Sequence, residues 1–122
     1  MNAANIDKDW AWVSKQNEKF GAEIANISNE ISQLAIQGPL ALKAMQKLTA
    51  ESVEDMEYYT TKTLTFAGIE NVIFSTTGYT GAGGCEIYFR NEDAEKIWNA
   101  VFEAGAEFDI KPIGLAARDT LR

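Results

Sequence analysis

A glycine-rich segment in the second half of the chain constrains its fold more than any other feature. Gly78, Gly81, Gly83 and Gly84 lie between two strand-like runs. Glycine reaches positive φ angles and lets other groups approach the backbone closely, so this composition predicts a close-packed connection between strands. A nucleotide-binding P-loop is not indicated, because no Gly-Lys-Ser/Thr sequence ends the segment and no helix pattern follows it. A ligand loop and an ordinary flexible hairpin loop both remain open.

Strand-like sequence surrounds this segment. Residues that favour strands alternate with polar residues in several short stretches. We predict strands at Gln33–Gln37, Tyr58–Phe66, Asn71–Thr77 and Cys85–Phe89. Residues 67–70, with the sequence Ala-Gly-Ile-Glu, have the composition of a hairpin connection, so the strands on either side of them are expected to pair antiparallel.

Apolar residues at helical spacing account for much of the remaining chain. We predict helices over about residues 6–20, 39–48, 92–104 and 113–122. Asn5 and Asn91 are suited to N-cap positions, and Pro39 to the first position of a helix. Trp98 belongs to the apolar stripe of the third helix, so we expect it in the core. The order of elements predicts an α+β fold in which helices pack on one face of an antiparallel sheet.

Composition excludes several function classes. The chain has 122 residues, 46% of them hydrophobic, which suits one modest domain. Its net charge of −7 disfavours binding to nucleic acids or to anionic membranes. Histidine is absent and Cys85 is the only cysteine, so a cysteine-based metal site and an internal disulfide are both excluded. A reducing, cytoplasmic setting is the expectation, with no metal cofactor and no membrane-spanning segment.

Two charged side chains are candidates for ligand binding. Glu86 lies in the otherwise apolar run Cys85–Phe89, beside the glycine-rich segment. If it faces a pocket, its carboxylate can accept two parallel hydrogen bonds from a planar amino-heterocycle, whereas strand alternation also allows it to face solvent. Arg118 is followed by Asp119, a combination that is more often a surface ion pair. From these residues alone, the chain is an α+β domain with a candidate ligand loop.

Three motifs, in order and spacing, resemble the T-protein (aminomethyltransferase) family of the glycine cleavage system. They are Gln37-Gly38-Pro39, then Gly78-Tyr79-Thr80-Gly81 followed by Gly84-Cys85-Glu86-Ile87, and finally Gly114-Leu115-Ala116-Ala117-Arg118-Asp119. The opening Asn2-Ala3-Ala4-Asn5 and the later Asp9-Trp10 are similar as well. The resemblance therefore extends over essentially the whole chain.

The resemblance implies a transferase of one-carbon metabolism. Such an enzyme takes an aminomethyl group from the lipoyl arm of the H protein and passes the one-carbon unit to tetrahydrofolate, releasing ammonia and forming 5,10-methylenetetrahydrofolate. Lipoylated H protein and tetrahydrofolate are the partners that the resemblance implies. No metal is part of that chemistry.

The family pattern also implies site residues. Glu86 would hold the pterin ring, Tyr79 would line the folate pocket, and Arg118 would lie at the folate site. The further positions implied to contact or surround folate are Asn2, Tyr58 and Glu70. Ala82 stands where the family usually has an acidic residue, and pterin binding is not expected to depend on that side chain.

Members of the family are much longer than this chain, and their key catalytic aspartate lies upstream of the matching region. We therefore expect residues 1–122 to be a single folate-binding segment of a larger enzyme, lacking the catalytic segment before it and a β-rich domain after it, and inactive by itself. One alternative is the folate-binding module of a dimethylglycine- or sarcosine-oxidising enzyme, or of a T-like protein of iron–sulfur assembly. Another is a structural domain whose glycine-rich segment binds nothing.

Overall fold

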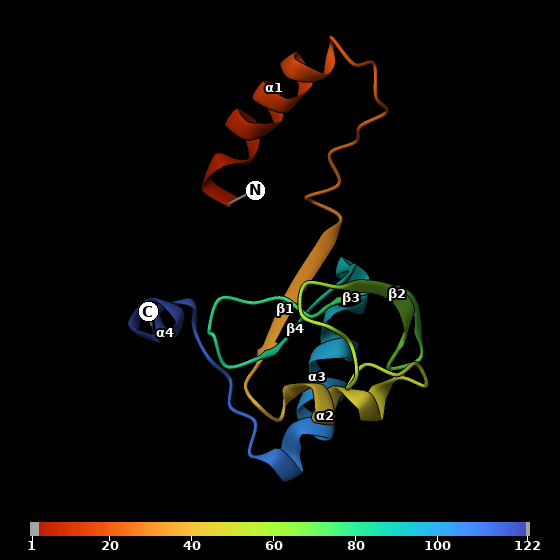
Figure 1. Cartoon of the computed structure of the whole chain (residues 1–122), viewed down its shortest axis with the longest axis vertical. Helices are drawn as coiled ribbons and strands as arrows, with labels where there is room; N and C mark the ends of the chain where they lie inside the picture. The colour runs from red at the N-terminus through yellow and green to blue at the C-terminus, as the bar shows by residue number, and fades with distance from the viewer. Residues whose placement is uncertain (1–2, 122) are drawn as a thin grey trace. The chain divides into compact units, whose positions relative to one another are not determined.

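The computed structural model describes residues 3–121, apart from the side chains of Arg118 and Leu121. The chain divides into two compact units, Met1–Ile31 and Ser32–Arg122. Figure 1 shows the helices and strands along the chain. Among the described residues, no helix combines the length and the apolar character that a bilayer crossing requires.

The first unit contains one helix, α1 (Ile6–Asn17), which follows a short 3-10 turn at Ala3–Asn5. Asn5 occupies the N-cap position as predicted, but its side chain makes no capping hydrogen bond. The helix ends before Phe20 because Asn17 closes it. The Asn17 side chain donates to the carbonyl of Ala22 at 2.6 Å and accepts from the Ala22 N–H at 3.0 Å, which directs the chain away from the helical path.

The second unit is built around a four-stranded sheet. Its elements are β1 (Ile31–Gln37), α2 (Ala41–Met45), β2 (Thr61–Phe66), β3 (Ile69–Ser75), β4 (Gly84–Arg90), α3 (Ala94–Gly105) and α4 (Leu115–Leu121). The strand order is β1-β4-β3-β2, with β3 antiparallel to both β2 and β4. β1 also runs opposite to β4, because Ser32 bonds to Asn91 at one end while Gly38 bonds to Gly83 at the other.

A two-residue turn joins β2 to β3. Ala67 and Gly68 both have positive φ angles, 52° and 77°, and Phe66 pairs with Ile69. Two positive φ angles in a two-residue loop match the right-handed twist of a hairpin. The turn therefore lies within the predicted residues 67–70, but it is shorter than predicted, because Ile69 and Glu70 belong to β3.

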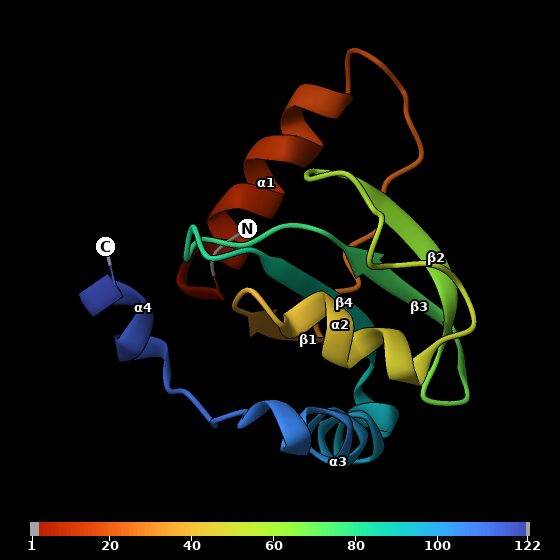
Figure 2. The same cartoon turned by 60° about the horizontal axis from the view of Figure 1, so that its bottom comes forward.

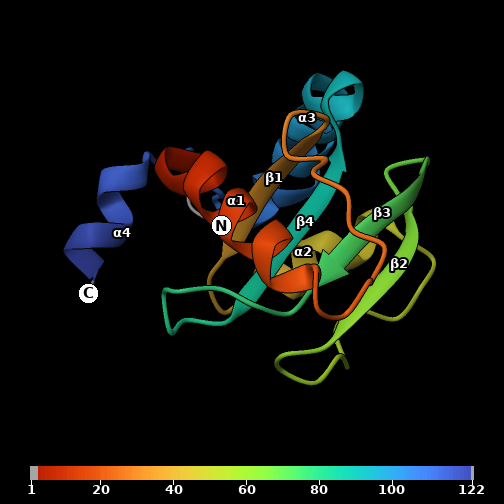
Figure 3. The same ribbon diagram turned by 90° about the horizontal axis from the view of Figure 1, so that it is seen from above.

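Helices α2 and α3 cover one face of the sheet, as the sequence predicted (Figures 1 and 2). Figure 3 views the sheet with both helices behind it. The strand side chains on the covered face alternate with exposed or half-buried ones and are the largest part of the core. Fully buried members of this core include Met45, Val53, Phe66, Val72, Phe74, Cys85, Ile87 and Ile97. An α+β fold with one covered sheet face is confirmed.

Three further details of the helices differ from the prediction. Asn91 begins a 3-10 turn, Asn91–Asp93, and Asp93 is the N-cap residue of α3. Pro39 lies in the turn before α2, which begins at Ala41 with Leu40 as its N-cap residue. Trp98 is 44% exposed, so the expectation that it is a core residue was wrong. The buried stripe of α3 follows Ile97, Val101 and Ala104, and position 98 is rotated about 100° away from position 97. The Trp98 ring packs on Phe102 instead, with ring centroids 4.8 Å apart.

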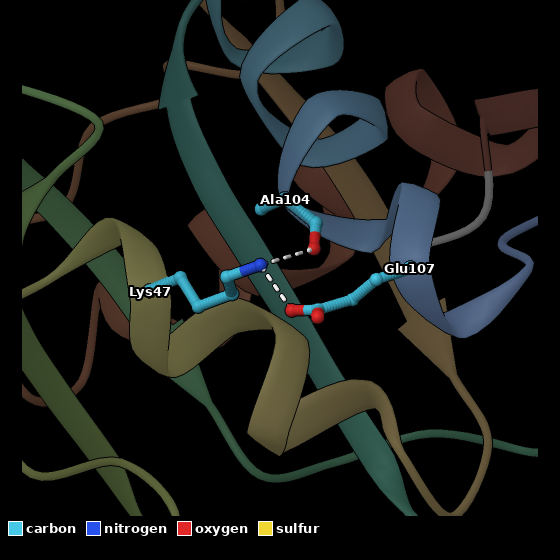
Figure 4. Close-up of polar contacts among 3 residues, drawn as sticks. All are labelled: Lys47, Ala104 and Glu107. Carbon is cyan, nitrogen blue, oxygen red and sulfur yellow. Dashed lines mark hydrogen bonds and ion pairs between the residues drawn. The ribbon is translucent and has the colours of Figure 1, made fainter.

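Lys47 joins the α2 region to the end of α3 (Figure 4). Its ammonium group donates to the carbonyl of Ala104 at 3.4 Å and forms an ion pair with Glu107. A cation at the C-terminal end of a helix interacts favourably with the partial negative charge of the last carbonyls. This contact therefore holds together the two helices that cover the sheet.

Candidate functional site

The glycine-rich loop, residues 78–84, forms part of a pocket of about 340 Å³. We call this cavity the loop pocket. Its lining comprises Gln37, Tyr58, Thr77 and the four glycines of the loop. These residues come from the end of β1, the segment before β2, and the connection between β3 and β4. The fold thus brings three distant parts of the sequence to one end of the sheet.

Gln37 is the most highly connected side chain of the loop pocket. Its amide nitrogen donates to the carbonyls of Thr77 at 3.2 Å and Cys85 at 2.9 Å. Its amide oxygen accepts from the Thr80 hydroxyl at 3.0 Å. The same hydroxyl accepts from the Ala82 N–H at 3.3 Å. One side chain on β1 therefore binds both ends and the middle of the glycine-rich loop.

Close approach explains two of the loop glycines. A Cβ on Gly78 would lie 2.0 Å from the amide oxygen of Gln37. A Cβ on Gly84 would lie 2.3 Å from the carbonyl oxygen of Ile36, and Gly84 also has a φ of +127°. Both distances are too short for any real side chain, so the sequence prediction of a close-packed loop is confirmed.

Tyr58 reaches the loop pocket because Thr76 anchors the segment that carries it. Thr76 is 2% exposed, and its hydroxyl donates to the carbonyl of Glu57 at 2.5 Å and accepts from the Thr60 N–H at 3.2 Å. Tyr59 has a φ of 67°, and its ring packs edge-on against Tyr58 at 4.6 Å between centroids. The Tyr58 side chain remains 67% exposed and is accessible to a ligand.

Glu86 lies next to the loop pocket, on the sheet face opposite α2 and α3. Its carboxylate accepts from the Gln33 amide at 2.8 Å through one oxygen and from the Thr77 hydroxyl through the other. Thr77 itself lines the pocket. These two donors orient the carboxylate, and an ionised carboxylate has further acceptor capacity for a ligand. Glu86 is half-buried, so such a ligand can reach it.

Burial and the charge of Glu86 affect two neighbours on β4. Burial, followed by the nearby Glu86 charge, raises the pKa of Cys85 to about 12. The pKa of Tyr88 is raised above its ordinary value, chiefly by burial and further by Glu86 and Tyr79. Both groups are therefore neutral near pH 7, and neither supplies a nucleophilic anion there.

The other predicted site residues are more scattered. Tyr79 lies in the glycine-rich loop and is 66% exposed. Glu70 is the second residue of β3, beside the Ala67–Gly68 turn, and five residues or roughly 17 Å of strand separate it from Ser75 at the end nearer the loop. The structure thus brings Tyr58, Tyr79 and Glu86 to one end of the sheet and Glu70 to the other.

Two predicted residues cannot be compared with the loop pocket in the same way. Arg118 belongs to α4, and its side chain is outside the described part of the structure. Asn2 lies outside the described residues altogether. Their roles at a folate site stay predictions.

Gln37, Gln33 and Thr77 were missed as functional residues from the sequence. Gln37 was part of a recognised motif, but nothing in its spacing indicates hydrogen bonds to residues 40 or more positions away. Across residues 3–121, no group of three or more His, Cys, Asp or Glu side chains is arranged to bind a metal ion. The arrangement offers a fixed carboxylate, an accessible aromatic ring and exposed loop backbone, which together suit a planar, hydrogen-bonding ligand.

Comparison with known proteins identifies the family. Residues 1–122, the entire chain, match the family described as the GCVT N-terminal domain. The chain belongs to this family. Relatives of this chain include the aminomethyltransferase of Bacteroides fragilis, which is 61% identical over all 122 residues, and that of Flavobacterium psychrophilum, which is 58% identical over the same span. The aminomethyltransferase of Alkaliphilus metalliredigens is 46% identical over 123 aligned residues.

The matches cover only part of these relatives. The whole of this chain aligns with each relative. The aligned region is 34% of the Bacteroides fragilis and Flavobacterium psychrophilum proteins and 33% of the Alkaliphilus metalliredigens protein. The chain therefore spans about a third of the length of the curated relatives it matches.

Proposed function

We propose that the protein is an aminomethyltransferase of the glycine cleavage system. In this reaction an aminomethyl group passes from the lipoyl arm of the H protein to tetrahydrofolate, with release of ammonia and formation of 5,10-methylenetetrahydrofolate. The observation that carries the proposal is the whole-chain match to the GCVT N-terminal domain family, together with 61% identity to a protein named aminomethyltransferase. We further propose a cytoplasmic location, in line with the sequence expectation.

The role proposed for this chain is to bind tetrahydrofolate. Glu86 accepts hydrogen bonds from the pterin ring, and Tyr58 and Tyr79 provide aromatic surface for it. The geometry supports this assignment, since the Glu86 carboxylate is held by two donors at the edge of a 340 Å³ pocket that Tyr58 lines. An oriented carboxylate is suited to a planar partner with two N–H donors.

Arg118, Asn2 and Glu70 complete the proposed folate-binding set. The first two are assigned from the family motifs alone. Glu70 is the weakest member on geometric grounds, because β3 separates it from the loop pocket. A substitution at Glu70 is therefore expected to affect folate binding less than one at Glu86.

A reconstituted transfer assay tests the proposal. The protein is expressed from its complete gene and supplied with aminomethyl-loaded, lipoylated H protein and tetrahydrofolate, and ammonia and 5,10-methylenetetrahydrofolate are measured. Both products should form, in equal amounts and only when both substrates are present. Absence of turnover from a folded protein that contains all of its native sequence would refute the assignment.

A further inference from the structure

Gln37 closes a hydrogen-bonded circuit around the loop pocket. The circuit runs from the Ala82 N–H to the Thr80 hydroxyl, then to the Gln37 amide, and from there to the Thr77 and Cys85 carbonyls. The amide nitrogen has two hydrogens, and because each is donated to one of these carbonyls, both donors are used. Beside this circuit, the N–H of Gly38 donates to the carbonyl of Gly83 at 2.9 Å.

Two glycines of the loop lie in open space. Gly81 and Gly83 have positive φ angles of 69° and 79°, and a Cβ on either would meet nothing within 4 Å. Glycines in open space lose more backbone freedom on ordering than other residues. The loop therefore needs anchors to hold one conformation, and Gln37 binds it at Thr80 and at the two flanking residues, Thr77 and Cys85.

We propose that Gln37 is a positioning residue, which holds the glycine-rich loop in the conformation that forms the ligand pocket and so sets the affinity of that pocket. The proposal rests on the proposed function for the identity of the ligand, tetrahydrofolate. Gln37 takes no part in the transfer chemistry. Its amide acts through the loop backbone, because its two donors are already occupied by Thr77 and Cys85.

A second glutamine in the same unit provides a matched comparison. The amide nitrogen of Gln46 donates to the carbonyls of Thr49 at 3.2 Å and Glu51 at 2.9 Å. Its amide oxygen accepts from the N–H of Val53 at 2.8 Å and from that of Glu54. Gln46 thus anchors a different loop, residues 49–54, by the same chemistry and from outside the loop-pocket lining. Loss of either amide removes a comparable set of hydrogen bonds.

The test compares Gln37→Met and Gln46→Met with the wild type, each expressed from the complete gene. Methionine keeps most of the side-chain length and removes the amide donors and acceptor. Three quantities are measured: the Kd for tetrahydrofolate, kcat and KM separately in the transfer assay, and the hydrogen-exchange rates of backbone amides in residues 78–84 and 49–54. The exchange data report loop order without requiring activity.

We expect Gln37→Met to raise the Kd for tetrahydrofolate by about tenfold or more, as loss of two or three hydrogen bonds implies. KM for tetrahydrofolate should rise with it, kcat at saturation should change far less, and amides in residues 78–84 should exchange faster. Gln46→Met should accelerate exchange in residues 49–54 and leave the Kd within about twofold of wild type. Thr80→Val, which removes one link of the circuit, should give a smaller increase in Kd.

Several outcomes would overturn the inference. If Gln37→Met has the same Kd for tetrahydrofolate and the same exchange rates in residues 78–84 as the wild type, the anchor is dispensable. An equal loss of affinity in Gln46→Met would show that general destabilisation, and not loop position, is responsible. If Gln37→Met does not fold, an unchanged Kd and unchanged loop exchange in Thr80→Val reject the inference. If wild-type protein binds no tetrahydrofolate, the proposed function fails, and loop exchange in Gln37→Met decides the role of Gln37 separately.

Discussion

At the scale of single residues, polar side chains decide the form of the candidate site. Gln33 and Thr77 fix the two oxygens of Glu86, and Thr76 anchors the segment that carries Tyr58. Sequence alone singled out Glu86, since a lone acid in an apolar strand beside glycines is unusual. Its partners could not be found in that way, because Gln33 lies 53 positions from Glu86 and a pairing at that separation depends on strand order.

Replacement of Glu86 by alanine should weaken tetrahydrofolate binding. Loss of a charge-assisted hydrogen bond costs about 1–3 kcal/mol, which corresponds to a rise in Kd of roughly 5- to 150-fold. Isothermal titration of the full-length protein measures the change. Thr63→Ala, at an exposed position on β2, is the control and should bind as wild type does. Equal affinity of Glu86→Ala and Thr63→Ala for tetrahydrofolate would show that Glu86 does not hold the pterin ring.

Replacement of Thr76 by valine should destabilise the fold, because valine keeps the shape and removes the hydroxyl. The carbonyl of Glu57 would lose the bond from the Thr76 hydroxyl, but the hydroxyl and the N–H of Thr60 also donate to that carbonyl, at 2.6 Å and 3.2 Å. Because each of these backbone groups keeps another partner, we expect a loss of about 0.5–1.5 kcal/mol in the free energy of unfolding, measured by urea denaturation. Thr63→Val serves as the exposed reference, and a similar loss in both variants would contradict this account.

At the scale of elements, the sequence predicted which segments become helices and strands better than it predicted where they end. Strand alternation placed β3 and β4 to within two residues at each end. The early end of α1 was not predicted, because it depends on the hydrogen bonds between Asn17 and Ala22. The spacing of apolar residues gives no information about such bonds. Trp98 was misassigned for a related reason: helical spacing finds a stripe but does not fix which of two adjacent apolar positions faces the sheet.

The turn between β2 and β3 provides a test at the same scale. Gly68→Ala forces a side chain into a φ of +77°, where the left-handed conformation costs roughly 1–2 kcal/mol. The free energy of unfolding should fall by about that amount in chemical denaturation. Gly114→Ala is the matched control, since its Cβ would meet nothing within 4 Å and it lacks a positive φ. A destabilisation of both variants to the same extent would argue against turn strain as the cause.

At the scale of the whole molecule, the two compact units should differ in their resistance to proteolysis. All side chains from Glu18 to Glu30 are exposed, and residues 21–27 are outside any helix or strand. Brief digestion with trypsin should therefore cut first after Lys19, and mass spectrometry should find a persistent product that retains the sheet. Early cleavage after Lys62 or Lys96, within β2 and α3, would contradict the assignment of a stable second unit.

The burial of Cys85 has a practical consequence for spectroscopy. The only cysteine of the chain lies in the core with no exposed surface, and its pKa of about 12 keeps the thiol protonated. Thiol-directed dyes and spin labels react with accessible thiolates. A single cysteine introduced on the glycine-rich loop, for example by Ala82→Cys, would therefore be labelled selectively in the native chain without prior removal of Cys85. Fluorescence or electron paramagnetic resonance could then follow the loop directly as ligand is added.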